Sequence, residues 1–270
     1  MELTHFQLEI EQGIARLTFN RPDKANALHM PAWKEMKAAF EYLHTHPQVR
    51  VVILSGQGKH FCAGIDLETL MSLQAFQQMD CEARKREALR DFILVLQSAI
   101  NAIEHCRKPV LAAVHRACLG GGLDIAAACD MRYCTDDAYF AVKEIDLGLV
   151  ADLGSLQRLP TILGPGMVAE MAYTGRKVHG PEAEKIGLVN NSFATAEAMM
   201  DHVTNIASQI ASKSPLVVRG TKEMLLYKRD HGVHDSLDYM ATWNAAMFFS
   251  KDLQEAFAAS MEKRQPQFDQ

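Results

Sequence analysis

The chain has 270 residues, 48% of them hydrophobic and 23% charged, and its formal net charge at pH 7 is −5. These values are ordinary for a soluble globular protein that buries a sizeable core. The mild negative charge and the lack of any run of five Lys or Arg residues argue against a nucleic-acid surface.

The N-terminus and the cysteines indicate a reducing compartment. The segment MELTHFQLEI lacks the charged and apolar regions of a secretion signal, and no run of eighteen apolar residues exists to cross a membrane. The six cysteines form no C-x-x-C pair and several lie in apolar stretches, which is typical of buried free thiols. We therefore expect a cytoplasmic protein with no membrane partner.

Strands alternate with helices from the N-terminus onward. Residues 51–55, VVILS, are typical of a strand buried on both faces, and Pro31 is expected to open a helix with apolar residues at helical spacing. Residues 82–105 carry the same helical periodicity. The expected strands cover residues 6–10, 14–19, 51–55, 110–115, 131–134 and 139–142. This alternation favours an α/β arrangement with a partly parallel sheet.

From about residue 195 the pattern becomes helical. Four successive windows have helical periodicity, and their apolar faces must pack on the core, on a neighbouring subunit, or on both. These windows cover residues 196–212, 215–229, 235–249 and 250–263. We predict a core domain of residues 1–195 and a helical C-terminal region of residues 196–270.

A glycine run, Gly120-Gly121-Gly122, separates the apolar strand from an apolar segment that begins at Leu123. A helix that starts at these glycines would present unpaired backbone N–H groups with the positive end of the helix dipole behind them. A second N–H at the end of the CAGID segment, residues 62–66, could converge with them on a carbonyl oxygen and stabilise an enolate. The alternative is that the glycines only permit close helix–sheet packing.

Three acids follow in largely apolar surroundings. Asp124 would lie in the first helical turn, where the dipole alone favours a carboxylate, and Asp152 could be a helix N-cap. Glu144 could be a solvated charge at a strand end. Taken together they are harder to explain structurally, because an unpartnered carboxylate in an apolar run is costly. Carboxylates clustered in a dry pocket would share a proton and could serve as acid and base.

Other catalytic patterns are not found in the sequence. No serine lies in a G-x-S-x-G elbow, and no G-x-G-x-x-G opens a first βαβ unit, so a nicotinamide cofactor is not supported. The pairs His44/His46 and His231/His234 lack further ligands at metal spacing. We therefore expect neither a metal nor a cofactor.

Several separated motifs, in order, resemble those of the enoyl-CoA hydratase/isomerase (crotonase) family. They are NRPDKANAL, FCAGIDL, KPVLAAVHRACLGGGLDIAAACDMRYC, LGLVADLGSLQRLP, SPLVVRGTKEML and EKRQPQF. The resemblance covers nearly the whole chain. It implies a spiral core of ββα units with a C-terminal helical trimerisation region, assembled as a trimer or as a dimer of trimers.

The acids indicate a branch within that family. Hydratases place a glutamate where this chain has Asp124, a second one at the position of Glu144, and normally a glycine at the position of Asp152. The set found here is instead similar to that of Δ3,5–Δ2,4-dienoyl-CoA isomerases, which move two conjugated double bonds of an acyl-CoA in fatty acid β-oxidation. The resemblance implies that Asp152 takes the C2 proton, Glu144 serves C6 and Asp124 tunes or relays. A hydratase acting on 2-enoyl-CoA is the alternative.

The resemblance also implies the binding residues. The backbone N–H groups of Ile65 and Gly121 would form the oxyanion hole, and coenzyme A would enter only as part of the substrate. The residues implied to contact the acyl-CoA are Lys24, Ala25, Asn26, Ala63, Gly64, Ile65, Asp66, Leu67, Gly122 and, from a neighbouring subunit, Lys263. A non-catalytic, RNA-binding member of the fold is a further alternative, but the most charged window, CEARKREALR, mixes both signs.

Overall fold

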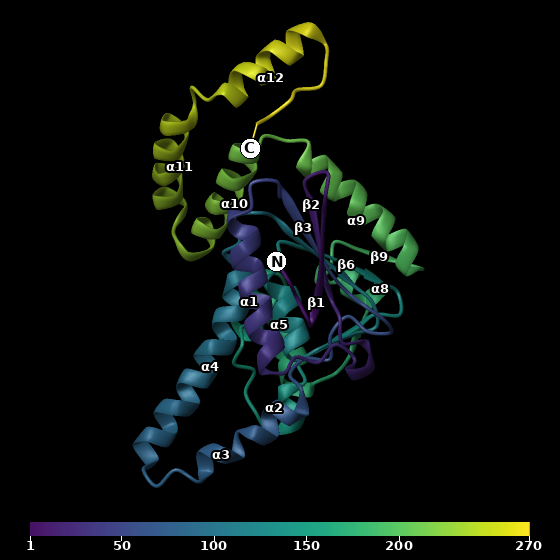
Figure 1. The fold of residues 1–270 in the computed structure, drawn as a ribbon, viewed down its shortest axis with the longest axis vertical. Helices are drawn as coiled ribbons and strands as arrows, with labels where there is room; N and C mark the ends of the chain where they lie inside the picture. The colour runs from purple at the N-terminus through teal and green to yellow at the C-terminus, as the bar shows by residue number, and fades with distance from the viewer. Residues whose placement is uncertain (270) are drawn as a thin grey trace.

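A six-stranded sheet forms the centre of the fold, which the computed structural model describes for residues 1–269 (Figure 1). Its spatial order is β1-β2-β3-β4-β6-β9, with β1 antiparallel to β2 and the other neighbours parallel. The strands are β1 (Phe6–Glu11), β2 (Ile14–Phe19), β3 (Val51–Gly56), β4 (Val110–Val114), β6 (Met131–Thr135) and β9 (Asn191–Phe193). All but β9 were predicted, and the partly parallel α/β arrangement is confirmed.

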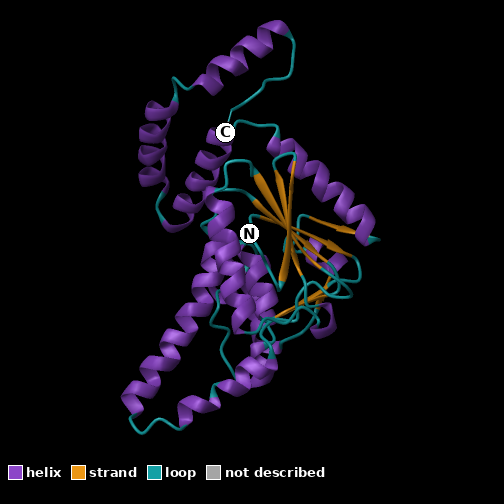
Figure 2. Cartoon of the chain, viewed as in Figure 1, coloured by secondary structure: helices purple, strands orange, loops and turns teal. Residues whose placement is uncertain are grey.

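Helices cover both faces of this sheet, as Figure 2 shows. The main core lies between the sheet and helices α1 (Met30–Thr45), α4 (Glu82–Glu104) and α5 (Gly121–Ala128). Residues 51–54 of β3 are completely buried because a second core, formed by α9 (Ala196–Ala211), covers the opposite face. The α9 residues in this second core are Met199, Val203, Ala207 and Ala211.

The packing of α9 bears on the predicted division at residue 195. α9 buries its apolar face on strands β3, β4 and β6 and packs as part of the layered core, and the division at residue 195 stays a prediction. The following helices, α10 (Pro215–Asp230), α11 (Val233–Met247) and α12 (Lys251–Glu262), extend away from the sheet (Figure 1). Large apolar side chains on α11, on α12 and between them are exposed, among them Leu237, Phe248, Phe249, Phe257 and Met261.

A second, three-stranded sheet connects the core to the glycine run. It has the order β5-β7-β8, made of β5 (Ala117–Leu119), β7 (Tyr139–Ala141) and β8 (Val178–His179). The strand that leads into Gly120 is not the apolar strand expected at residues 110–115, because the chain turns at Arg116 and the separate strand β5 follows it. Arg116 has a φ of 52°, and such a left-handed residue breaks an extended strand.

The remaining elements are short and lie around the ends of the two sheets. They are η1 (Pro22–Lys24), α2 (Leu67–Ser72), α3 (Gln74–Gln77), η2 (Glu144–Leu147), α6 (Ser155–Arg158), η3 (Leu159–Thr161), α7 (Pro165–Thr174) and α8 (Gly180–Lys185). None of the helices in the described part of the chain combines the length and apolar composition needed to cross a bilayer.

Replacing Gly122 by alanine should destabilise the fold. A Cβ at Gly122 would lie 2.5 Å from the Cys62 carbonyl oxygen and 3.1 Å from the Cys62 Cβ. We expect Gly122→Ala to lower the free energy of unfolding by about 1–3 kcal/mol, the usual range for an overpacked core. Denaturant-induced unfolding measures this change.

Gly166→Ala is the matched control, because Gly166 lies in α7 with no atom within 4 Å of an added Cβ. Its free energy of unfolding should stay unchanged or rise by up to about 1 kcal/mol. Equal effects at the two glycines would contradict the packing described for α5.

Candidate active site

The 62–66 segment lies against the start of α5, and each carries a backbone N–H group without a partner among residues 1–269. A methyl group added at Gly64 would lie 3.1 Å from the nitrogen of Gly121. The chain beside it is held by hydrogen bonds from Leu28 N–H to the Gly64 carbonyl and from Asp66 N–H to the Leu28 carbonyl. Within residues 1–269 neither the Ile65 N–H nor the Gly121 N–H donates a hydrogen bond. These two donors are therefore free to bind an acceptor.

The free donor of Gly121 follows from helix geometry. Gly121 is the first residue of α5, so its N–H has no carbonyl one turn earlier to bind. All eight residues of α5 are buried, which keeps water away from the positive end of this helix. The ring of Trp33 lies beneath Gly121, 3.3 Å from where a Cβ would be.

Asp124 is completely buried and is tied to the loop that carries Asp152. Its Oδ1 accepts hydrogen bonds from the Ser155 N–H at 2.5 Å and from the Ser155 hydroxyl at 2.6 Å. Its Oδ2 has no partner among the described residues. Burial raises the pKa of Asp124 to about 7, against the opposing effect of the Ser155 hydrogen bonds, and the negative charge of Glu144 adds to the increase.

Glu144 lies beside the glycine run. A Cβ added at Gly120 would be 3.0 Å from its Oε1, so the carboxylate is adjacent to the start of α5. Its Oε2 is buried without a hydrogen-bond partner in the described structure. Burial raises the pKa of Glu144, and the charge of Asp152 raises it further.

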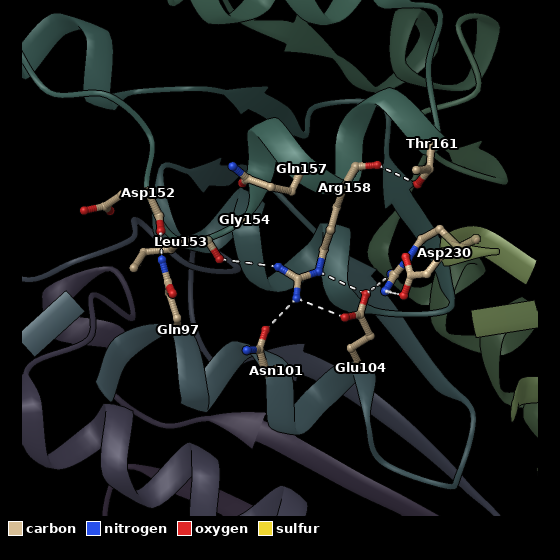
Figure 3. A pocket seen from close by; sticks show the side chains of 11 residues that line it. Gln97, Asn101, Glu104, Asp152, Leu153, Gly154, Gln157, Arg158, Thr161 and Asp230 are labelled. Atoms are coloured by element: carbon tan, nitrogen blue, oxygen red, sulfur yellow. Dashed lines mark hydrogen bonds and ion pairs between the residues drawn. The ribbon is translucent and has the colours of Figure 1, made fainter. Parts of the chain in front are cut away.

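Asp152 is the most accessible of the three acids. Its residue is exposed in the single chain, but partial burial of the carboxylate still raises its pKa. Its side chain points away from Arg158 and Glu104 (Figure 3). Since Glu144 is influenced by Asp152, and Asp124 by Glu144, the three acids form one electrostatically connected series. Groups of this kind hold protons at a pH where ordinary carboxylic acids are ionised.

The N-terminal loop is built largely by Asn26. Asn26 is buried, and its side-chain amide donates to the carbonyls of Gln57 and His60 while its Oδ1 accepts from the Arg21 N–H. These bonds use the side chain fully, which leaves only its backbone for a ligand. Ala25, in the left-handed conformation, accepts from the Ala63 N–H at 3.0 Å, so this loop and the 62–66 segment are one unit.

Asp66 has a structural role in the same unit. It is the N-cap of α2, accepts from the Glu68 N–H at 3.0 Å, and pairs with Arg21 at 3.1 Å. Burial opposes ionisation, but these hydrogen bonds and the Arg21 charge outweigh it and lower the pKa of Asp66. Asp66 is therefore a fixed negative charge, unlike the three acids above.

The other predicted binding residues lie in different settings. Gly122 is buried behind the free amides, and Leu67 and Lys24 are exposed next to the unit just described. Lys24 forms no ion pair among residues 1–269. Lys263 follows α12 and lies at the opposite end of the molecule from α2 (Figure 1), so within one chain it does not join the site.

Sequence reasoning missed Ser155, Arg21 and Gln97, which hold the site residues in place. Ser155 binds Asp124, Arg21 binds Asp66, and Gln97 donates to the Asp152 carbonyl at 2.6 Å. Only Ser155 carried a signal, since it follows the Asp152-Leu153-Gly154 turn at the start of a helix. No group of three His, Cys, Asp or Glu side chains arranged for a metal ion occurs among the described residues.

The sequence from residue 9 to residue 270 matches the family model described as enoyl-CoA hydratase/isomerase, and the chain belongs to this family. The solved structure of enoyl-CoA hydratase from Bacillus anthracis is similar, with a TM-score of 0.88 and 28% identity, covering 98% of this chain and 99% of that one. The predicted crotonase-like spiral of ββα units is thereby confirmed.

Two relatives with a higher sequence identity share one enzyme name. The chain is 49% identical to the peroxisomal Δ(3,5)-Δ(2,4)-dienoyl-CoA isomerase of Arabidopsis thaliana, covering 96% of this chain and 93% of the relative. It is 44% identical to the mitochondrial enzyme of the same name from Homo sapiens, covering 94% of this chain and 78% of that relative.

These names correct the predicted cytoplasmic location, which is wrong by this comparison because the two relatives are named as peroxisomal and mitochondrial proteins. The prediction used the cysteines and the lack of a secretion pattern. All six thiols are free and five are buried, but such thiols suit any reducing compartment and do not distinguish the cytosol from an organelle.

The raised pKa of Asp124 predicts a pH-dependent stability. Its pKa is about 7 in the folded chain and 3.8 as the ordinary value, so between these values the folded state holds a proton that the unfolded state has lost. The stabilisation is complete below about pH 4 and is lost as the pH rises through 7. Asp124→Asn keeps an oxygen for Ser155 and cannot ionise, so it should remove this loss.

Unfolding free energies at pH 4 and pH 8 test this prediction. From pH 4 to pH 8, the free energy of unfolding of Asp124→Asn should increase relative to that of the wild type by at most about 4 kcal/mol. This limit follows because a tenfold change in an ionisation constant corresponds to about 1.4 kcal/mol. Asp201→Asn, at an exposed site on α9, serves as the control. Parallel pH dependences of wild type and Asp124→Asn would refute the prediction.

Proposed function

We propose that this protein is a Δ3,5–Δ2,4-dienoyl-CoA isomerase. The observation that carries the proposal is the presence of a third acid, Asp152, which acts electrostatically on Glu144 beside the unpaired N–H of Gly121. The relatives that share about half of its sequence bear that name. Two acids whose pKa values are raised by burial, next to an oxyanion-binding pair, suit proton transfer along an acyl thioester.

The reaction begins when the thioester oxygen binds the N–H groups of Ile65 and Gly121. Asp152 removes a proton from C2, and the electron pair of that C–H bond forms a conjugated enolate whose negative charge rests on the bound oxygen. Glu144 delivers a proton to C6, the carbonyl forms again, and the double bonds at C3 and C5 become double bonds at C2 and C4. The substrate loses one proton at C2 and gains one at C6, so its composition is unchanged, and Asp152 ends protonated while Glu144 ends ionised.

Asp124 affects the position of Asp152 and the ionisation of Glu144. Its buried carboxyl holds Ser155 and therefore fixes the loop next to Asp152, and its pKa near 7 responds to the charge on Glu144. A neutral Asp124 avoids adding a second negative charge beside Glu144, which keeps Glu144 able to ionise and to accept a proton again. The chemistry described requires no cofactor.

The coenzyme A portion binds across the unit formed by the N-terminal loop and the 62–66 segment. Backbone groups of Ala25, Asn26, Ala63 and Gly64 line this unit, while Asp66 and Leu67 follow it at the start of α2. Lys24 is exposed and has no ion-pair partner in the described chain, so its charge suits a phosphate of the ligand. Gly122 supports the site from within α5.

The exposed apolar side chains around α11 and α12 favour assembly of several copies, as a trimer or a hexamer. An apolar surface of this kind is costly in water and is typical of a subunit interface. In such an assembly, Lys263 of the partner subunit would complete the coenzyme A site.

The purified wild type should convert a 3,5-dienoyl-CoA much faster than it hydrates a 2-enoyl-CoA. The product has its two double bonds conjugated with the thioester, so its ultraviolet absorption appears at longer wavelength than that of the substrate. Assaying both substrates side by side measures the preference. Faster turnover of the 2-enoyl-CoA would favour the hydratase, for which Asp124 and Glu144 occupy the expected acid positions.

Asp152→Asn should reduce isomerase kcat by several orders of magnitude, because the amide cannot accept the C2 proton; losing a catalytic base alone costs about 10²–10⁴-fold. Asp201→Asn, which changes the same residue type on the exposed side of α9, should retain wild-type kcat. Near-full activity of Asp152→Asn would exclude the proposed role.

A further inference from the structure

The loop that carries Asp152 is held from behind by one face of α4. Gln97, Asn101 and Glu104 lie four and three residues apart, which places them on the same side of that helix. Figure 3 shows them facing the turn at residues 152–154 across a pocket of about 570 Å³. Asp152 lines this pocket, whereas Asp124 and Glu144 do not, so only one of the three acids borders it.

Gln97 makes the direct contact. Its side-chain amide donates to the backbone carbonyl of Asp152 at 2.6 Å, which leaves the Asp152 carboxylate unrestrained by this bond. The carboxylate points to the other side of the loop (Figure 3).

Arg158 holds the next two residues. Its Nη1 donates to the Leu153 carbonyl at 3.4 Å, and its guanidinium lies so close to Gly154 that any Cβ there would collide with it. Gly154 has a φ of 129°, a conformation that L side chains rarely adopt. With Arg158 packed against it, the turn can therefore take this shape only with glycine at 154.

The guanidinium is itself fixed by α4. Arg158 forms two parallel hydrogen bonds to the Glu104 carboxylate, each 3.1 Å long, and a third to the Asn101 side chain at 2.8 Å. Arg229 of α10 also pairs with Glu104. Burial alone would raise the pKa of Glu104, but the hydrogen bonds and charges of the two arginines lower it. This cluster stays ionised and is an anchor, not a proton donor.

We infer that Gln97 and Arg158 are positioning residues that hold the backbone of residues 152–154 and so set where the Asp152 carboxylate meets the substrate. The catalytic part of this inference rests on the proposed function. The mechanical part, that α4 restrains the loop, depends only on the contacts above.

The test uses Gln97, because removing the buried Arg158–Glu104 pair could unfold the protein. Gln97→Met keeps the side-chain length but cannot donate, whereas Gln97→Lys restores a donor of similar reach. Gln157→Met is the control, since Gln157 lines the same pocket and its side chain makes no hydrogen bond among residues 1–269. Each full-length variant is assayed for kcat and KM with a 3,5-dienoyl-CoA, and for amide hydrogen exchange of residues 152–155.

Gln97→Met should lower kcat about tenfold with KM within about twofold, since a misplacement of about 1 Å can cost about a hundredfold in rate. Exchange at residues 152–155 should accelerate in this variant, Gln97→Lys should restore both readouts, and Gln157→Met should match the wild type. Unchanged exchange in Gln97→Met would overturn the restraint by α4. Accelerated exchange with unchanged kcat would overturn the catalytic part.

The same experiment separates this inference from the proposed function. If the wild type fails to convert the dienoyl-CoA while Gln97→Met still accelerates exchange of the loop, the proposed reaction is wrong and the restraint stands. If the wild type is active and neither readout changes in Gln97→Met, the reaction stands and the positioning role is wrong.

Discussion

The contact between Asp124 and Ser155 joins the two halves of the candidate site. One half is the start of α5, with its free Gly121 N–H, and the other is the turn that bears Asp152. A completely buried carboxyl group would be costly without hydrogen bonds, and the two donors of Ser155 offset that cost at one oxygen only. The second oxygen has no partner among the described residues, which is why burial can raise the pKa of Asp124 so far.

Burial raises the pKa values of the three acids of the site above those of ordinary carboxylic acids. Asp66 lies close to the same segment, but Arg21 and a backbone N–H stabilise its ionised form. Asp124, Glu144 and Asp152 form no ion pair among residues 1–269, and burial raises the pKa of each. The difference lies in the partners that the fold supplies and not in the residue type.

A cluster of compensating charges lies on the side of the 152–154 turn opposite the Asp152 carboxylate. Glu104 and Asp230 balance the charges of Arg158 and Arg229 on the far side of the 152–154 turn, so this cluster supports the backbone without adding net charge next to Asp152. A rigid support and a reactive carboxylate therefore occupy opposite sides of one short loop (Figure 3). This arrangement suits a reaction that depends on exact placement more than on a strong base.

The sequence by itself determined the layered α/β fold, the family and the set of acids. Strands such as VVILS and helices with regular apolar spacing produce local sequence patterns, and these can be recognised without knowledge of distant contacts. It did not reveal β5, because three residues between a left-handed Arg116 and a glycine carry too little pattern. Nor could it show that Asn26 and Asp66 are used up by internal bonds, or that Gln97 and Arg158 reach the Asp152 loop. The contacts of Asn26, Asp66 and Gln97 join residues 31 to 55 positions apart, and the contact of Arg158 comes from the following helix, so only tertiary packing decides them.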